Sequence, residues 1–352
     1  MENTSGIHPG ISNADNEQNL EEDPGVVSDS EFTAVLGYFL SGKIGEGSFA
    51  VVRMAEFRTV ASRDVLACKI IDLAKCPMEY IERFLPREMG IWPEVRHRNL
   101  IGVHSILEHG SRIYVFMEYA PNGDLLDYVM QCGRLSEQQA NVWSRQMGEG
   151  VDYLHSRDIA HRDLKCENML ITNNWNVRIG DFGFVTKTFD NGERVLSKTF
   201  CGSLAYAAPE LIRGDPYDAR QADAWSLGIV LYVMFNASMP FDDSDMKQLL
   251  LDQEAKHWRL TKPARAYLTM DAISVLDGLL EPRELKRLTV ANMLKQKWYS
   301  TLNTRLSDPK TWANNNTKTH QASIHPNGAK GSNSPTVSPQ NRGSKSPPPG
   351  TK

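Results

Sequence analysis

The stretch IAHRDLKCENMLI, residues 159–171, places His, Arg, Asp, Lys, Glu and Asn within eight residues between apolar flanks. Polar groups beside buried segments need hydrogen-bond partners or a chemical task. Asp163 and Asn168 lie five residues apart on this expected loop, and the MLI that follows is typical of a strand. The segment therefore predicts a partly buried polar loop that carries chemistry.

The segment IGDFGF, residues 179–184, extends this set with Asp181. One amide and two carboxylates that converge would offer the hard oxygen ligands that Mg²⁺ prefers. A further carboxylate that is left free of metal can orient a hydroxyl nucleophile. We expect Asp163, Asn168 and Asp181 to share these two tasks.

Upstream, GEGSFAVV (residues 45–52) lies between two segments of alternating apolar and polar residues. Gly45 and Gly47 would let the backbone approach phosphate oxygens and present its N–H groups. Ala50 occupies the third glycine position of G-x-G-x-x-G. Taken alone, the motif favours an ordinary hairpin turn over a phosphate-binding turn. A dinucleotide-binding site is disfavoured because that motif requires strand, turn and helix.

Lys69 lies in VLACKIID (residues 65–72), where strand alternation places it on one face with Ala67 and Ile71. An ammonium group among apolar neighbours is stabilised by a nearby anion, so this pattern predicts an anionic partner. A lysine whose stem lies along a strand edge also fits this pattern. Glu88, in a helical segment nineteen residues further on, is a candidate ion-pair partner that would hold the ammonium toward phosphates.

The wider pattern predicts an α+β fold with two lobes. Strands are expected on both sides of the Gly-rich turn and over 64–73, and a hairpin is expected within 100–119. Pro86 interrupts a helical pattern at 79–92. Ser136 is the expected N-cap of a long amphipathic helix, and 222–235 predicts a buried helix. A small β-rich lobe (38–119) should precede a larger α-helical lobe (120–299).

The two ends of the chain differ from the middle in composition. Residues 1–35 hold eight acidic and no basic residues, whereas 301–352 hold seven Lys or Arg and one Asp. Both ends are poor in large apolar groups, so we expect disorder in an acidic segment 1–34 and in a basic, Ser/Pro-rich tail 303–352.

Overall composition indicates a soluble globular protein. The net charge of −4 gives no general attraction to nucleic acid or to an anionic membrane. No apolar run approaches the roughly 18–20 residues of a membrane span, and no signal peptide is evident. Five cysteines without paired spacing are typical of reduced thiols. We therefore expect a cytoplasmic protein, with the nucleus as the alternative.

The motifs, taken together and in order, resemble the signature set of eukaryotic protein kinases. The resemblance covers residues 38–299 and rests on Lys69, Glu88, HRDLKCEN (161–168), DFG (181–183), AAPE (207–210) and DAWSLG (223–228). FLPREM (84–89), KTFCGSLAYAAPELIRGDPYD (198–218) and SMPFDDS (238–244) further resemble the testis-specific serine/threonine kinase family, within the calcium/calmodulin- and AMP-activated-kinase-like group.

This resemblance implies a bilobal kinase fold and roles for individual residues. Asp163 would orient the substrate hydroxyl, Lys165 would neutralise charge on the γ-phosphate of ATP, and Lys69, held by Glu88, would contact the other phosphates. Asn168 and Asp181 would hold Mg²⁺. Glu210 and Arg287 would form a structural ion pair, and Asp223 would support the catalytic loop. The nucleotide site would be lined by Ile44, Gly45, Glu46, Gly47, Ser48, Phe49, Ala50, Val51, Val52, Ala67, Met117 as gatekeeper, Glu118, Ala120, Asp124 and Leu170.

The resemblance also bears on substrates. Lys165, two residues after Asp163, follows the serine/threonine pattern, so the partners would be protein substrates. Asp124 and Glu167 match positions that bind an arginine N-terminal to the target residue, although two solvated acids fit equally well. The expected oligomeric state is a monomer, and germ-cell differentiation is implied only by the family.

Regulation is expected in LSKTFCGS (196–203). Phosphate on Thr199 would add about −1.5 to −2 charges and could pair with Arg162, which would order the loop. The phosphate could come from an upstream kinase or from the protein itself, and an unmodified threonine is the alternative. Ser197 and Ser203 are competing hydroxyls, of which Ser203 should line the substrate groove.

Two other classes of protein are alternatives to an active protein kinase. An inactive, scaffolding kinase domain has only Ala50 in its favour, and alanine fits that position if its φ is negative. A small-molecule kinase is disfavoured by CGSLAYAAPE (201–210), which resembles a groove for extended peptides. Cys166 and Cys201 are expected to be packing residues, with a redox role as the alternative.

Overall fold

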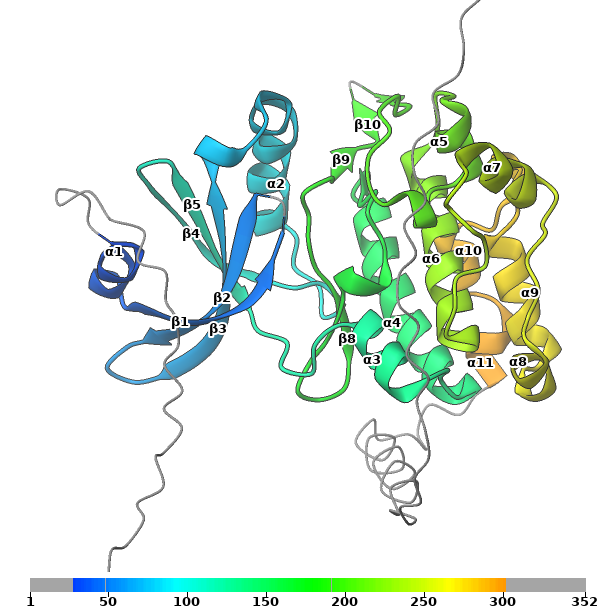
Figure 1. Ribbon diagram of the computed structural model, residues 1–352, viewed down its shortest axis with the longest axis horizontal. Helices are drawn as coiled ribbons and strands as arrows, with labels where there is room; N and C mark the ends of the chain where they lie inside the picture. Colours follow the sequence, from blue (N-terminus) through cyan, green and yellow to red (C-terminus); the bar gives the residue numbers. More distant parts are fainter. Residues whose placement is uncertain (1–27, 48, 191, 302–352) are drawn as a thin grey trace, which may run out of the picture. The chain divides into compact units, whose positions relative to one another are not determined.

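The computed structural model describes residues 28–301 except Ser48 and Asn191. Its first part is a five-stranded antiparallel sheet in the order β1-β2-β3-β5-β4, and its second part is mostly helical (Figure 1). The predicted two-lobed α+β architecture is therefore confirmed. The sheet strands are β1 (Tyr38–Glu46), β2 (Ala50–Arg58), β3 (Arg63–Asp72), β4 (Val103–His109) and β5 (Arg112–Glu118).

Strand β3 lies at the centre of the sheet and pairs with both β2 and β5. Its side chains alternate between two faces, as a pleated strand requires. Ala67 and Ile71 enter the main hydrophobic core, whereas Leu66, Cys68 and Ile70 enter a second cluster on the opposite face. Lys69 thus lies on the face that looks toward the second lobe, as the alternation predicted.

The helical segment after β3 begins with a wide turn. A short turn η1 (Leu73–Lys75) is followed by the π-helical turn η2 (Tyr80–Phe84), helix α2 (Leu85–Ile91) and turn η3 (Trp92–Glu94). Pro86 lies in the first turn of α2, where its missing N–H costs little. The predicted interruption is therefore a change in helix type rather than a break.

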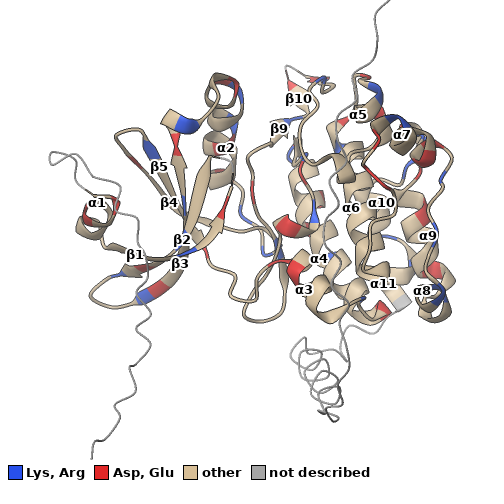
Figure 2. Ribbon diagram, viewed as in Figure 1, with Lys and Arg blue, Asp and Glu red and all other residues tan. Residues whose placement is uncertain are grey.

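Two long helices form the centre of the second lobe. Ser136 caps α4 (Glu137–His155) by accepting from the N–H of Gln139, as predicted. Helix α6 (Ala219–Asn236) is buried along most of its length and almost free of charged residues (Figure 2). The other helices are α3 (Leu125–Cys132), α5 (Pro209–Arg213), α7 (Met246–Glu254), α8 (Lys262–Tyr267), α9 (Met270–Leu279), α10 (Val290–Met293) and α11 (Lys297–Thr301), with η6 (Glu284–Lys286) before α10.

Short strands and turns form residues 159–206 of the second lobe. They carry the polar motifs identified from the sequence and connect α4 to α5. These elements are β6 (Ile159–Ala160), η4 (Cys166–Asn168), β7 (Met169–Ile171), β8 (Val177–Ile179), β9 (Thr186–Lys187), β10 (Phe189–Asp190), β11 (Glu193–Arg194) and η5 (Leu204–Tyr206).

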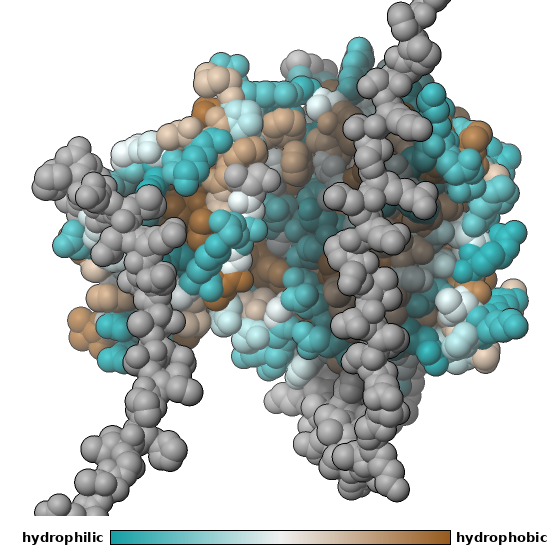
Figure 3. Space-filling model, in the orientation of Figure 1, coloured by the Kyte–Doolittle hydropathy of each residue, from teal (hydrophilic) through white to brown (hydrophobic). Residues whose placement is uncertain are grey.

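The outer surface of the second lobe is mostly polar. Figure 3 shows hydrophilic side chains over α7, α8 and α9 with only scattered apolar ones between them. This distribution is the expected outer face of amphipathic helices. Within the described part of the chain, no helix combines the length and apolarity needed to cross a bilayer.

One expectation for the N-terminal segment is wrong. Residues 29–34 were expected to be disordered, but they belong to helix α1 (Asp29–Val35). Ser28 and Glu31 form a capping box, and Asp29 receives hydrogen bonds from Arg112 at 2.6 Å and Tyr114 at 2.5 Å. Local capping and docking on the sheet compensate for the low hydrophobicity. Residues 1–27 and the tail 303–352 lie outside the described residues.

Candidate active site

Asp223 of α6 holds the loop that carries Asp163 through hydrogen bonds to the loop backbone. The buried Asp223 accepts hydrogen bonds from the backbone N–H of His161 at 2.9 Å and of Arg162 at 2.7 Å. The predicted support of the catalytic loop is therefore confirmed. Arg162 has a φ of +66°, a strained conformation for a long side chain that these two bonds help to hold.

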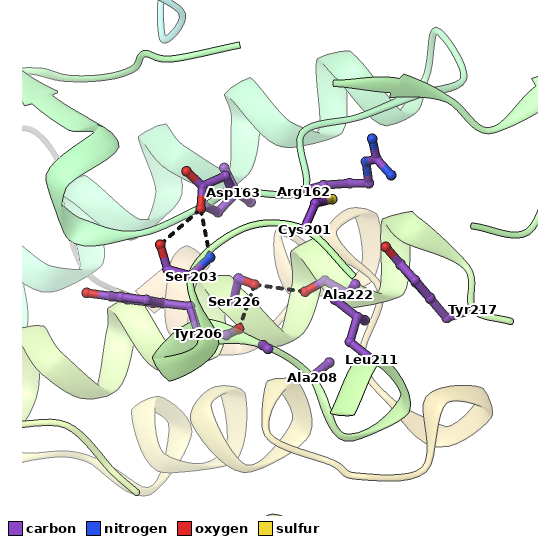
Figure 4. A pocket seen from close by; sticks show the side chains of 12 residues that line it. Arg162, Asp163, Cys201, Ser203, Tyr206, Ala208, Leu211, Tyr217, Ala222 and Ser226 are labelled. Carbon is purple, nitrogen blue, oxygen red and sulfur yellow. Dashed lines mark hydrogen bonds between the residues drawn. The ribbon is translucent and has the colours of Figure 1, made fainter. Parts of the chain in front are cut away.

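Asp163, Lys165 and Ser203 contact one another. The Lys165 ammonium lies 3.1 Å from Asp163 Oδ2 and donates to Ser203 Oγ at 3.0 Å. Ser203 donates to Asp163 Oδ1 through its N–H at 3.1 Å and its hydroxyl at 3.2 Å (Figure 4). Ser203 therefore lies against Asp163, and its expected place along a substrate groove stays a prediction. A carboxylate, an ammonium and a hydroxyl thus meet at one point.

Lys69 joins the two lobes. Its ammonium lies 2.7 Å from Glu88 Oε1 on α2 and 3.0 Å from Asp181 Oδ1 on the other lobe. Burial opposes the ammonium charge, but the charges of Glu88 and Asp181 outweigh burial and raise the pKa of Lys69. Lys69 in turn lowers the pKa of Asp181, which is therefore an anion at neutral pH.

Asn168 and Asp181 fit the chemistry of a magnesium site. The Asn168 amide nitrogen donates to the backbone carbonyl of Asp163 at 2.8 Å and to its Oδ2 at 3.1 Å, so the amide oxygen is the atom that a cation can use. The Asp181 side chain is 43% exposed and ionised. One amide oxygen and one carboxylate are hard ligands of the type that Mg²⁺ accepts alongside water and phosphate.

The Gly-rich turn is a hairpin between β1 and β2. The N–H of Gly47 donates to the carbonyl of Ala50 at 2.8 Å, and Ala50 pairs with Ile71 in extended, negative-φ backbone. Alanine therefore fits this position, which removes the one argument for an inactive domain. On the two strands, Glu46 lies opposite Val51 and Gly45 lies opposite Val52. Ser48 lies outside the described residues.

The residues expected around adenine lie on neighbouring elements. Ala67 pairs with Met117 across β3 and β5, and Leu170 of β7 forms a bridge with Asp124. The N–H of Glu118 donates to the carbonyl of Gly102 at 3.0 Å. Burial raises the pKa of the Glu118 carboxyl. Along the sequence, Ile44 precedes the Gly-rich turn in β1 and Ala120 follows β5.

Asp124 has a structural task as well as an expected functional one. Its Oδ1 accepts from the N–H of Asp127 at 2.9 Å and caps α3. Burial, with contributions from Asp127 and Glu167, raises the pKa of Asp124. Glu167 is therefore close enough to act on Asp124, and it accepts from the Tyr206 hydroxyl at 3.3 Å. The two acids form one negatively charged region.

Thr199 contacts Arg83, and Arg83 and Arg162 in turn lie close enough to Arg87 to act on its charge. The Thr199 hydroxyl accepts a hydrogen bond from Arg83 of η2, and its carbonyl accepts from Tyr217 at 2.9 Å. Burial and the positive charges of Arg162 and Arg83 lower the pKa of Arg87. Arg162 donates to the carbonyl of Phe184 at 2.7 Å, and its buried Nη2 has no hydrogen-bond partner among the described residues.

The two cysteines near the site are buried packing residues. Burial raises the pKa of Cys166 to about 12 and also raises that of Cys201. A thiol with a raised pKa holds little thiolate at neutral pH. These environments favour the packing interpretation over a redox role.

Sequence reasoning missed an aromatic stack that links the lobes. The buried rings of Trp92 and Phe182 stack with centroids 5.2 Å apart, and His161 meets Phe182 edge-on at 5.3 Å. Trp92 also donates to the carbonyl of Ile101 at 2.9 Å. Tyr80, Arg83 and Arg87 were not identified from the sequence either. The four-residue spacing of Arg83 and Arg87 on a helical segment was the available signal, since such residues share a face.

Comparisons with known proteins agree with this geometry. The family described as "Protein kinase domain" matches residues 38–299. Testis-specific serine/threonine-protein kinase 2 of Mus musculus is 42% identical over 265 residues, which is 74% of this chain and 73% of that protein. Testis-specific serine/threonine-protein kinase 3 of Mus musculus is 42% identical over 269 residues, covering 76% and 98%.

A more distant relative, testis-specific serine/threonine-protein kinase 4 of Homo sapiens, is 35% identical over 307 residues, which is 81% of this chain and 92% of that protein. The family match spans the Lys69–Glu88 pair, the Asp163 loop and the segment from Asp181 to Glu210. The chain therefore belongs to the protein kinase family, as a serine/threonine protein kinase similar to the testis-specific kinases.

Proposed function

We propose that the protein transfers the γ-phosphate of ATP to serine and threonine hydroxyls of protein substrates, with Mg²⁺ as cofactor. The observation that carries this proposal is the contact of Asp163, Lys165 and Ser203. Asn168 links this contact to the segment of Asp181, because it donates to Asp163 Oδ2 at 3.1 Å and accepts from the N–H of Gly180 at 2.9 Å. In this arrangement the groups for phosphate binding and for hydroxyl orientation converge from both lobes.

In the proposed reaction Asp163 accepts a hydrogen bond, and then the proton, from the substrate hydroxyl. The hydroxyl oxygen forms a bond to the γ-phosphorus as the bond from that phosphorus to the β–γ bridging oxygen breaks, and ADP leaves. Lys165 offsets negative charge on the moving phosphoryl group, and Lys69 binds the other phosphates. Asn168 and Asp181 would hold Mg²⁺, which when bound neutralises phosphate charge.

The direct test is transfer of labelled γ-phosphate from ATP to a basic Ser/Thr peptide and to the protein itself. Wild-type protein should transfer phosphate, and chelation of Mg²⁺ should stop the transfer. Asp181→Asn should abolish it while leaving the thermal unfolding midpoint close to that of wild type. Wild-type protein that carries phosphate on Thr199 and still transfers none would make a scaffolding function the better account.

We further propose that phosphorylation of Thr199 activates the enzyme. The support is a cluster of arginines from η2, α2 and the catalytic loop. In this cluster burial, followed by repulsion from Arg162 and Arg83, lowers the pKa of Arg87, and the buried Nη2 of Arg162 has no hydrogen-bond partner among the described residues. A phosphate would add charge-assisted hydrogen bonds to these groups and tie α2 to the activation segment, residues 181–210.

Thr199→Ala should lower peptide phosphorylation at least about tenfold, because the loss of such bonds leaves the segment unanchored. Ser197→Ala removes a neighbouring hydroxyl and should leave activity unchanged. Phosphosite mapping on wild-type and Asp181→Asn protein expressed in cells would identify the source of the phosphate. Thr199 phosphorylated in both indicates an upstream kinase, and Thr199 phosphorylated only in the wild type indicates autophosphorylation. Full activity of Thr199→Ala would end this proposal.

A preference for arginine N-terminal to the target residue is proposed for the substrates. The support is the acidic region of Asp124 and Glu167, whose mutual influence contributes to the raised pKa of Asp124. An arginine placed there would relieve that repulsion and form charge-assisted bonds.

Asp124→Asn is the sharpest variant for this test, since asparagine preserves the helix cap while removing the charge. On a peptide array, Asp124→Asn and Glu167→Gln should each reduce the preference for arginine about tenfold, while phosphorylation of neutral peptides stays unchanged. Asp243→Asn, at an exposed acid in the loop before α7, should leave the preference intact. An array without arginine preference in the wild type would remove the idea.

We also propose a monomer in the cytoplasm of differentiating male germ cells. The support is the testis-specific description of the similar kinases and the free state of all five cysteines. Light scattering of the purified full chain should give the mass of one copy. Immunostaining of germ-line tissue should show cytoplasmic signal, and an exclusively nuclear signal would correct this placement.

A further inference from the structure

Tyr80 contacts the carboxylate of Glu88 on the side away from Lys69. The Tyr80 hydroxyl donates to Glu88 Oε2 at 2.8 Å, while the Lys69 ammonium binds Oε1 at 2.7 Å. Each carboxylate oxygen therefore has its own donor. Glu88 is fully buried, so an oxygen that lost its donor would remain unsolvated or would rotate away from its present position.

The donor role of Tyr80 is defined by its surroundings. Burial, and then the negative charge of Glu88, raise the pKa of the Tyr80 hydroxyl, which therefore keeps its proton at neutral pH. A protonated hydroxyl facing an anionic carboxylate oxygen can only donate. The hydrogen bond is thus charge-assisted and stronger than one between neutral groups.

The π-helical turn explains how Tyr80 reaches Glu88. In a regular α-helix, residues eight apart differ by about 80° around the axis, because one turn holds 3.6 residues. The bond from the N–H of Leu85 to the carbonyl of Tyr80 adds one residue to the turn, which takes back about 100°. Tyr80 and Glu88 thereby come within about 20° of the same helix face.

Pro86 favours this wide turn. Proline has no N–H for the α-helical bond to the carbonyl of Glu82, and its ring would collide with that carbonyl in a regular helix. The sequence FLPREM therefore does two things at once: it permits α2 to continue and it sets the rotation between Tyr80 and Glu88.

We propose that Tyr80 is a positioning residue for phosphotransfer, which holds Glu88 in the rotamer that directs Lys69 toward the nucleotide. This inference rests on the proposed function. Tyr80 acts through Glu88 and not on the substrate itself. Its ring also contacts Phe49 of the Gly-rich turn, with centroids 6.0 Å apart, so a variant that keeps the ring isolates the hydroxyl.

Tyr80→Phe in the full chain is that variant. We expect kcat/KM for ATP to fall about tenfold, as expected for the loss of one charge-assisted hydrogen bond, and KM for the peptide to stay unchanged. Binding of a fluorescent ATP analogue should weaken in the same direction. Tyr232→Phe is the matched control, since its hydroxyl donates to the carbonyl of Arg259 at 2.7 Å in the second lobe, and its kinetics should equal those of wild type.

A double-mutant cycle with Glu88→Ala decides whether Tyr80 works through Glu88. In the Glu88→Ala background, Tyr80→Phe should change kcat/KM for ATP by less than about twofold. An equal loss in both backgrounds, or an unchanged kcat/KM for Tyr80→Phe in the wild-type background, would overturn the inference. Absence of phosphotransfer by the wild-type protein would instead refute the proposed function, so the two failures are distinct.

Discussion

At the scale of single residues, Gly202 occupies a position near the site where any side chain would clash with the backbone. Its φ is +86°, and a Cβ at this position would lie 2.5 Å from the carbonyl oxygen of Arg162 and 3.2 Å from Asp163 Oδ1. Gly202 also precedes Ser203, whose N–H donates to Asp163. The glycine thus allows the activation segment to lie directly against the catalytic loop.

Gly202→Ala should therefore disable catalysis. The clash with backbone forces the segment away from Asp163, and a displacement of about 1 Å at such a contact can cost about 100-fold in rate. Peptide phosphorylation would be measured together with thermal unfolding. Gly192→Ala is the control, because its φ is also +86° but its Cβ would meet nothing within 4 Å. Equal activity of the two variants would contradict the steric argument.

The cysteines give a prediction with a pH dependence. Because the pKa of Cys166 is about 12, only about one thiol in 10,000 would be ionised at pH 8. Native-state alkylation at pH 8, followed by mass spectrometry, should leave Cys166 and Cys68 unmodified and label the half-buried Cys76 and Cys132 first. Since the thiolate is the reactive form, Cys166 labelling should rise with pH. Rapid labelling of Cys166 at pH 7 would revive the redox interpretation.

At the scale of elements, α1 covers the face of the sheet opposite to Lys69. Phe32 stacks on His109 with centroids 4.2 Å apart and packs against the second hydrophobic cluster. Phe32→Ala should lower the free energy of unfolding by about 1–3 kcal/mol, since this side chain is only partly buried. KM for ATP should not change, because the nucleotide site lies on the other face of the sheet.

Val35→Ala is the matched control for α1, because Val35 is 86% exposed on the same helix. Its unfolding midpoint in urea should equal that of wild type. If Phe32→Ala also left the midpoint unchanged, α1 would contribute nothing to stability and its docking would need another explanation.

The elements also show which inferences the sequence permits. Strand alternation, the Gly-rich turn and the Ser136 cap depend on neighbouring residues, so the sequence predicted β1 to β5 and α4 correctly. Helix α1 was missed although Ser28 and Glu31 form a local capping signature, because its docking depends on Arg112 and Tyr114, which are distant in the sequence. The π-helical turn was missed because Pro86 predicts a disturbance but not its geometry.

The same distinction applies to the candidate site. Lys69, Asp163, Asn168 and Asp181 could be identified because the motifs have fixed spacing. The contacts of Thr199 with Arg83, and of Glu88 with Tyr80, could not be identified because they depend on how α2 is rotated and how it meets the activation segment. Long-range contacts of single side chains need the folded coordinates.

At the scale of the whole molecule, a buried ion pair ties the activation segment to the end of the second lobe. Arg287 donates to Glu210 Oε1 at 2.6 Å and Oε2 at 2.8 Å, as predicted from the motifs. Arg287 also donates to the carbonyls of Glu281 at 2.9 Å and Gln221 at 2.9 Å. Arg287 thus joins α5, through Glu210, and α6, through Gln221, to the segment just before it in the sequence.

Removal of one partner should be much worse than removal of both. Arg287→Ala leaves the buried Glu210 carboxylate without its cation, which should cost about 3–5 kcal/mol and lower the unfolding midpoint by about 6–20 °C. Arg287→Met with Glu210→Leu should recover part of that loss, since apolar side chains of similar size can fill the space.

Arg98→Ala, which breaks an exposed pair with Glu149, is the control and should change the free energy of unfolding by less than about 1 kcal/mol. A double variant no more stable than Arg287→Ala would mean that the hydrogen bonds of Arg287 to the surrounding carbonyls, and not the buried charge of Glu210, hold the activation segment to the lobe.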